Sequence, residues 1–187
     1  MKCVLTIAGS DSGGGAGIQA DLKAFAALGV FGTSAITAVT AQNTVGVRRV
    51  DVLEPDAVRA QIDAVVEDFA VAAVKTGMLA NAPIIREVAR ALDDHGLRPV
   101  VIDPVCVAGS GDPLLEPDAL EVLRNELVPR ASVLTPNLSE AALLVGRKSA
   151  GETDAELAST ARELLSMGAG AVLLKGGHRR GDADDLF

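Results

Sequence analysis

Aromatic side chains are scarce in this sequence of 187 residues, which contains four Phe and no Trp or Tyr. Hydrophobic residues nevertheless make up 49% of the chain and charged residues 22%, a composition typical of globular proteins. The core must therefore consist of Ala, Val, Leu and Ile, which favours helices packed closely on a buried sheet. The length suits a single domain over residues 1–187 with a sizeable core.

Cysteine is scarce as well, since Cys3 and Cys106 are the only two and they do not form a C-x-x-C pair. Their number and spacing argue against a disulfide framework and against a cysteine zinc site, and they fit a reducing compartment. The apolar start of the chain is too short for a signal peptide, because Asp11 interrupts it. We therefore predict a cytoplasmic protein.

Positive charge is in the minority, because 17 Lys and Arg stand against 25 Asp and Glu, a formal net charge of -8. This balance argues against nucleic acid or an anionic membrane as the main partner. Residues 24–47 carry no charge, but Thr, Ser, Gln, Asn and Gly interrupt the stretch. We interpret it as a helix end, a buried strand and a polar loop rather than a membrane-spanning helix.

Apolar runs of strand length alternate with segments of helical periodicity along the chain. The predicted strands are 4–8, 33–39, 50–53 at a sheet edge, 72–75, 100–102, 132–134 and 171–174. The predicted helices are about 16–28, 55–69, 84–92, 120–128, 138–144 and 154–167. This alternation predicts an α/β fold of three layers, with a mostly parallel central sheet and helices on both faces. In such sheets ligands bind outside the carboxyl ends of the strands, where the glycines and polar residues of this sequence concentrate.

A glycine-rich segment, residues 9–17, follows the first predicted strand. Four of the five residues at 13–17 are glycine, which lets the backbone approach a ligand closely and favours a functional loop over a plain turn. Residues 15–20 fit the dinucleotide pattern G-x-G-x-x-A, but no acidic residue occurs between Asp21 and Asp51, where that pattern requires one. The phosphate-loop pattern also fails, because no Gly-Lys-Ser/Thr follows.

Two polar positions near this segment stay open between an ordinary and a functional interpretation. Asp21 lies four residues after Gly17 in the first predicted helix, where an exposed carboxylate is common. Gln42 begins a polar triplet with Asn43 and Thr44 after the second predicted strand. The triplet suits a turn, yet its side chains could also hydrogen-bond the edge of a heterocycle.

Asp103 comes directly after the buried strand at 100–102. Burying an aspartate there costs free energy unless it has a partner. The partner could be a metal ion or a phosphate site, and the alternative is a helix cap or a turn. A second small loop, Ser-Gly-Asp at 110–112, follows it.

Asn137 and Glu140 stand three residues apart after a Thr-Pro pair. An Asn N-cap with an acidic residue at the third position is a capping signature, and spacing alone favours the cap. The functional alternative is a pair of oxygen ligands for Mg²⁺ or its water shell. Lys175 follows the last predicted strand, and the N–H groups of Gly176 and Gly177 could hold phosphate with it; the alternative is a solvated turn.

Together and in this order, the loops resemble those of the hydroxymethylpyrimidine/phosphomethylpyrimidine kinases of thiamin synthesis, in the ribokinase-like superfamily. The resemblance runs from the first predicted strand to the last residue. The matching pieces are Thr-Ile-Ala-Gly-Ser-Asp at 6–11, Gly-Gly-Ala-Gly-Ile-Gln-Ala-Asp-Leu-Lys at 14–23, Thr-Ala-Val-Thr-Ala-Gln-Asn-Thr at 37–44, Lys-Thr-Gly-Met-Leu at 75–79, Ile-Asp-Pro-Val at 102–105, Ser-Gly-Asp-Pro-Leu-Leu at 110–115, Thr-Pro-Asn-Leu-Ser-Glu-Ala at 135–141 and Leu-Lys-Gly-Gly-His at 174–178.

The resemblance implies phosphorylation, dependent on ATP and Mg²⁺, of the hydroxymethyl group of an aminopyrimidine and then of the resulting monophosphate. It assigns the pyrimidine pocket to Gly9, Asp21, Gln42 and Met78, with Gln42 bonded to the ring and Met78 packed on it. It assigns Mg²⁺, through water, to Asn137 and Glu140, which raises that interpretation above the cap. Lys175 would stabilise the transferring phosphate, with Asp103 and Gly177 on the phosphate and nucleotide side. Relatives commonly dimerise, so a homodimer is implied as well.

One departure from the family bears on activity. Relatives continue beyond the position of Phe187 to a Gly-Thr-Gly-Cys loop that stabilises the transferring phosphoryl group and carries the proposed base, and this sequence does not contain that segment. We therefore expect a C-terminally truncated chain with negligible kinase activity alone, and Cys106 does not replace the missing Cys. The alternatives left open are a pyridoxal kinase, a catalytically inactive pyrimidine-binding module and, remotely, a dehydrogenase. The Ala-Gln-Asn-Thr segment at 41–44 favours the pyrimidine.

Overall fold

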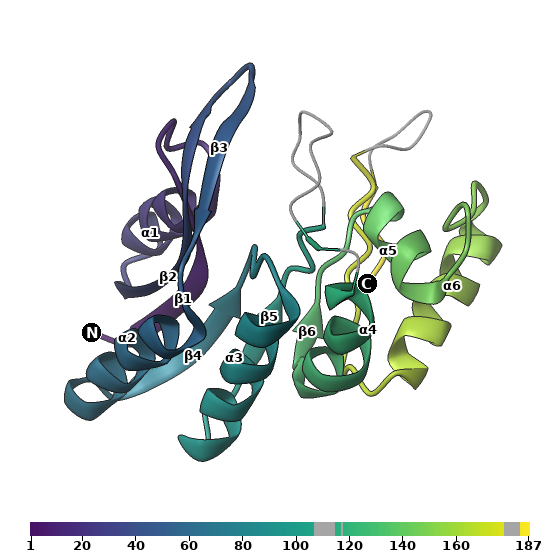
Figure 1. Ribbon diagram of the computed structural model, residues 1–187. Coiled ribbons are helices and arrows are strands. Elements are labelled where there is room, and N and C mark those ends of the chain that lie inside the picture. The colour runs from purple at the N-terminus through teal and green to yellow at the C-terminus, as the bar shows by residue number, and fades with distance from the viewer. Residues whose placement is uncertain (107–114, 117, 178–183) are drawn as a thin grey trace.

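The computed structural model describes residues 1–106, 115–116, 118–177 and 184–187. Within these residues, six strands form one sheet in the order β3-β2-β1-β4-β5-β6 (Figure 1). The strands are β1 (Cys3–Asp11), β2 (Phe31–Asn43), β3 (Gly46–Val52), β4 (Val71–Thr76), β5 (Val100–Ile102) and β6 (Val133–Leu134). All neighbours pair in parallel except β2 with β3, an antiparallel hairpin at one edge. The predicted fold class and the edge strand are confirmed, whereas the single domain stays a prediction.

Helices cover both faces of this sheet. The long ones are α1 (Gly17–Ala27), α2 (Pro55–Asp68), α3 (Ala82–Asp94), α5 (Leu138–Val145) and α6 (Asp154–Ser166). The α1 helix lies over the face that carries Thr6, because its Asp21 contacts the Thr6 hydroxyl. The α2 and α3 helices, side by side in Figure 1, share one core cluster with Leu5 and Ile7, whose side chains alternate with Thr6. The sheet thus lies between two layers of helices, which confirms the predicted three layers.

Local signals explain several helix ends. Pro55 opens α2 at its first turn, and Asn81 caps α3 by accepting a hydrogen bond from the Ile84 N–H at 3.0 Å. Gly96, with φ of 60°, follows the end of α3 as expected for a glycine past a helix C-terminus. The predicted helix at 120–128 changes pitch along its length, because it runs through α4 (Ala119–Val122), a π-helix (Leu123–Leu127) and a 3₁₀ turn (Val128–Arg130).

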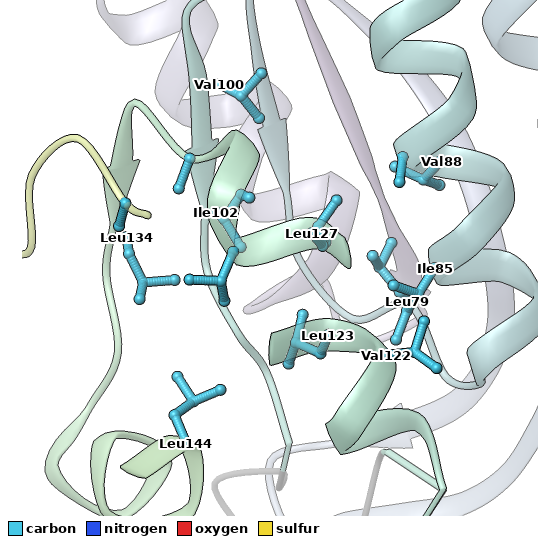
Figure 2. Close-up of a cluster of buried hydrophobic side chains, with 14 of the residues drawn as sticks. Leu79, Ile85, Val88, Val100, Ile102, Val122, Leu123, Leu127, Leu134 and Leu144 are labelled. Carbon is cyan, nitrogen blue, oxygen red and sulfur yellow. The ribbon is translucent and has the colours of Figure 1, made fainter. Parts of the chain in front are cut away.

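The core is aliphatic, as the composition requires. Figure 2 shows side chains from α3, β5, the 119–130 helical segment, β6 and α5 meeting in one cluster. Ile102, Leu127, Leu134 and Leu144 are fully buried in it. At about 25 cal/mol per Å² of apolar surface, burial of such side chains is the main stabilising contribution to the fold.

Several strands, β1 and β2 among them, run farther than the sequence predicts, and one predicted strand is not continuous. The β1 strand reaches Asp11, which pairs with Thr40 of β2, and β2 reaches Asn43, which pairs with Gly46 of β3. The strand predicted at 171–174 is wrong as a continuous element. This segment meets its neighbours only through isolated bridges, such as Leu134 with Val172, because β6 itself is two residues long. No helix in the described part of the chain is long and apolar enough to cross a membrane.

Candidate active site

The strand order places a crevice between β1 and β4. After β1 the chain moves to β2 and β3 on one side of it and later returns to β4 on the other. Ligands of open parallel sheets bind at such a switch point, outside the carboxyl ends of the strands. A pocket of ≈ 310 Å³ lies there, a volume suited to one small ring. Five residues singled out in the sequence line it: Gly9, Asp21, Gln42, Met78 and Asp103.

Gly9 lies inside β1, not in a loop after it as the sequence predicts. The pairing of β1 with β2 shifts register between Ala8 and Ser10, so Gly9 alone lies opposite two residues of β2, Thr37 and Ala38, which form a bulge. A Cβ atom on Gly9 would lie 2.5 Å from Cε of Met78. The missing side chain therefore leaves Met78 its place in the pocket wall.

The glycine-rich loop is held by an aspartate that the sequence reading did not single out. Asp11 is buried, and its Oδ1 accepts the Gly13 N–H at 2.8 Å. Its Oδ2 accepts the N–H groups of Gly15 at 3.0 Å and Ala16 at 2.8 Å. These donors are thus used within the chain, which contradicts a dinucleotide phosphate bound at this helix N-terminus. The available signal was the Asp two residues before a glycine, typical of a turn closed by its own side chain.

Asp21 is not the exposed carboxylate that its helical position permits. Its side chain is 16% exposed, and its Oδ2 accepts the Thr6 hydroxyl at 2.6 Å and the Lys75 ammonium at 2.9 Å. The α1 helix thus turns this carboxylate toward the sheet and the pocket. Lys75 is a pocket residue that our sequence reading missed, although a lysine inside the predicted buried strand at 72–75 was a usable signal.

The polar triplet was open between a turn and a ligand contact, and the structure places Gln42 in the pocket and Asn43 in the turn. Gln42 lies in β2 rather than after it and lines the pocket, with its Oε1 3.2 Å from the Thr40 hydroxyl. The Gln42 N–H donates to the Ser12 hydroxyl at 2.8 Å, which ties the hairpin to the glycine-rich loop. Asn43 makes the turn, since its Oδ1 accepts the Val45 N–H at 2.9 Å. Gln42 therefore lines the pocket, whereas Asn43 stabilises the backbone turn.

Asp103 has the partner that its position after a buried strand requires. Its Oδ1 lies 2.7 Å from Nζ of Lys175, and the same ammonium lies 4.0 Å from Oε2 of Glu140. Because Asp103 also lines the pocket, Lys175 and the predicted ring site lie on the same rim of the sheet. This places a cation and two carboxylates beside the space that a small ring would fill.

Asn137 and Glu140 form the cap that their spacing predicts. Asn137 Oδ1 accepts the Glu140 N–H at 2.9 Å, and Glu140 Oε2 accepts the Asn137 N–H at 2.8 Å. Burial raises the pKa of Glu140, opposed by the Asn137 N–H and by Lys175. Within the described residues no three His, Cys, Asp or Glu cluster in a way that could hold a metal ion. Mg²⁺ needs only one or two carboxylates when it arrives with phosphates, so Glu140 fits it in that form. The metal role of this pair stays a prediction.

The Lys-Gly-Gly turn offers less than the sequence suggests. The Gly176 N–H donates to Oδ1 of Asp185 at 2.7 Å, so it is not free for phosphate, contrary to the prediction. Gly177 is exposed, and its predicted contact with phosphate is untested. The small loop at 110–112 and His178 lie outside the described residues.

Both cysteines are free and buried. The Cys106 thiol donates to the Pro104 carbonyl at 3.1 Å, and burial, with smaller contributions from Glu140 and Asp103, raises its pKa to about 12. A thiol held so firmly protonated cannot act as a base near neutral pH.

Known proteins are similar to this chain in sequence and in fold. The chain matches the phosphomethylpyrimidine kinase family over residues 11–187. The hydroxymethylpyrimidine/phosphomethylpyrimidine kinase of Rhizobium meliloti is 57% identical over 98% of this chain and 68% of its own length. That of Salmonella typhimurium is 54% identical over 93% of this chain and 65% of its own length. The chain therefore spans about two thirds of these relatives.

Solved structures of other proteins have a similar fold. The phosphomethylpyrimidine kinase of Clostridium difficile 630 matches with a TM-score of 0.91 and 45% identity, covering 99% of this chain and 79% of that one. The pyridoxal kinase of Bacillus subtilis, solved as an ADP complex, matches with a TM-score of 0.88 and 38% identity, covering 99% of this chain and 69% of that one.

Proposed function

Because the chain belongs to the phosphomethylpyrimidine kinase family, we propose that its pocket binds 4-amino-5-hydroxymethyl-2-methylpyrimidine and its monophosphate for phosphorylation by ATP. One observation carries the proposal beyond family membership. The four residues that the resemblance assigns to the pyrimidine come from β1, α1, β2 and the segment after β4, and all four line one pocket: Gly9, Asp21, Gln42 and Met78.

In this proposal each side chain has a role suited to its chemistry. The Asp21 carboxylate accepts a hydrogen bond from the ring, Gln42 bonds the ring edge through its amide, and Met78 packs on the ring face. Lys175 lies beside Asp103 and supplies positive charge for the transferring phosphate. Mg²⁺, held through water by Asn137 and Glu140, would neutralise the nucleotide phosphates when bound. Gly177 would contribute a backbone N–H on the same side.

Pyridoxal kinase is the second candidate, because relatives of that activity share the fold. The pyridoxal kinase of Staphylococcus aureus, solved with an ATP analogue and pyridoxal, is 35% identical to this chain. The pyrimidine kinases are closer in sequence, at 57% and 54% for the two named above, which favours the pyrimidine. The free, buried cysteines accord with a cytoplasmic location as part of this proposal.

Calorimetric titration of the 187-residue chain tests the proposal directly. The aminopyrimidine should bind, pyridoxal should bind more weakly, and Gln42→Ala should lose affinity for the pyrimidine. The exposed Arg49→Ala variant, on the same hairpin, should bind as the parent does. Tighter binding of pyridoxal would transfer the assignment to that ring, and detectable binding of NAD alone would favour a dehydrogenase.

A turnover assay with ATP and Mg²⁺ addresses the expected lack of activity. Negligible phosphorylation together with pyrimidine binding supports a binding module in these 187 residues. Phosphate transfer at roughly 1 to 100 per second, the range of active kinases, would contradict that expectation and leave the pyrimidine assignment standing.

A further inference from the structure

One ion pair in the pocket wall has no role in the function proposed above. It joins Lys75 of β4 to Asp21 of α1. We propose that Lys75 is a positioning residue: with Thr6 it occupies one oxygen of Asp21, so that the other oxygen selects rings that carry an exocyclic amino group. The proposal rests on the proposed function, since it concerns specificity in the same pocket.

The sheet itself brings the two donors together. Thr6 and Lys75 are register partners in the parallel pair β1 and β4, so their side chains stand on the same face, the one that α1 covers. Asp21 reaches them from one turn into α1, with its carboxylate over the pair. Backbone pairing and helix packing therefore hold all three groups, and none depends on a loop.

The two oxygens of Asp21 are bonded unequally. Oδ2 accepts from both the Thr6 hydroxyl, at 2.6 Å, and the Lys75 ammonium, at 2.9 Å. Oδ1 accepts no hydrogen bond from the described part of the chain. A carboxylate that is paired with an ammonium can only accept hydrogen bonds, so Oδ1 suits an N–H donor and repels a carbonyl oxygen. An aminopyrimidine offers such a donor, and an oxo analogue offers an acceptor.

The space around Lys75 is also shaped for its ammonium. A Cβ on Gly77 would lie 3.0 Å from Nζ of Lys75, so the glycine leaves room for the charged end. The Lys75 side chain is 22% exposed and lines the pocket together with Asp21. In such a partly buried position a charged hydrogen bond is stronger than on the open surface.

Titration of two rings into four proteins tests the inference. The rings are 4-amino-5-hydroxymethyl-2-methylpyrimidine and the same molecule with hydrogen in place of the amino group. The proteins are the parent chain, Lys75→Met, Thr6→Val and the control Arg86→Met, which removes an exposed ion pair with Glu126. We expect the parent and the control to bind the amino ring more tightly than the ring without the amino group. In Lys75→Met the ratio of these two affinities should fall roughly tenfold. Affinity for the ring without the amino group should hardly change.

Each other outcome has a definite meaning. Equal weakening of both rings in Lys75→Met would show a merely structural role and overturn the inference. If thermal melting shows that Lys75→Met does not fold, Thr6→Val decides, because its preference should fall in the same direction by a smaller factor. An unchanged preference in Thr6→Val would then overturn the inference. Failure of the parent chain to bind either ring would instead remove the proposed function, and this inference with it.

Discussion

Gly9 of β1 and Met78, which follows β4, meet so closely that no other residue fits at position 9 without moving the methionine. A methyl group on Gly9 would lie 2.5 Å from the Met78 Cε, nearer than nonbonded carbons approach. The atom in the way is the end of a flexible side chain, so the methionine gives way more easily than the backbone. Because both residues line the pocket, that movement must change the shape of the pocket.

The Gly9→Ala variant should therefore bind the ligand clearly more weakly, while its free energy of unfolding falls only slightly. We expect a cost to folding of about 1 kcal/mol, at the low end for overpacking, and a loss of roughly tenfold in pyrimidine affinity. Calorimetry and thermal unfolding measure the two. Gly15→Ala is the matched control, because a Cβ there meets nothing closer than Asp11 Oδ2 at 4.0 Å. If Gly9→Ala costs as much affinity in a Met78→Ala background as it does in the parent, the clash with Met78 is not the cause.

The Asp11→Ala variant should destabilise the whole glycine-rich loop. It removes the acceptor for three backbone donors, those of Gly13, Gly15 and Ala16, and replaces a buried carboxylate. We expect a loss of about 2 to 3 kcal/mol in the free energy of unfolding by urea, together with faster amide exchange at these three residues. Asp51→Ala, which breaks an exposed pair with Arg49, should leave both measurements unchanged. Unchanged exchange in Asp11→Ala would show that the loop is held by other contacts.

Strand alternation predicts the sheet and the rim of the pocket, but it does not reveal the pairing that closes the site. Lys75 gives a local signal only of being a charge in a buried strand. Its partner, Asp21, lies 54 positions away, and the two meet only because α1 covers the face on which β1 and β4 run in register. Asp11 is similar. The sequence suggests that the N–H groups of the glycine-rich loop are free for phosphate, but in the structure the Asp11 carboxylate accepts them.

Strand ends are hard to predict for the same reason. Gln42 stands beyond the apolar run, so the pattern predicts a loop there. In the structure β2 continues because β3 pairs with it as far as Asn43. The segment at 171–174 shows the converse, where an apolar run has only a two-residue neighbour to pair with. Hydrophobic periodicity reports burial, whereas strand length depends on the partner.

Asn137→Ser separates the cap from the proposed metal role. Serine caps helices about as well as asparagine, so this variant should keep its stability, whereas Asn137→Ala should lose about 1 kcal/mol. If Asn137 helps to hold Mg²⁺, both variants should bind Mg²⁺ with ATP more weakly than the parent. Thermal melting and calorimetric titration report the two effects. Full binding by Asn137→Ser would leave only the cap that the hydrogen bonds show.

Glu140→Gln should change how stability depends on pH. Burial raises the pKa of Glu140 above its ordinary value of 4.5, so its contribution to stability is full below that value and is lost as pH rises through the raised pKa. Glutamine does not titrate and can still accept the Asn137 N–H. The variant should thus gain stability relative to the parent as the pH rises above 4.5. Urea unfolding at several pH values measures this difference, and a constant difference would contradict the raised pKa.

Cys106 should resist alkylation while the protein is folded. Burial raises its pKa to about 12, so very little thiolate is present near pH 8, and the residue is 5% exposed. Iodoacetamide followed by mass spectrometry should therefore leave Cys106 unmodified in the native protein and label it after unfolding in guanidinium, with Cys3 as the internal comparison for a second buried thiol. Rapid labelling of native Cys106 would show that the segment after β5 opens readily to solvent. In that case the contacts of Asp103 with Lys175, which depend on the same segment, would be transient as well.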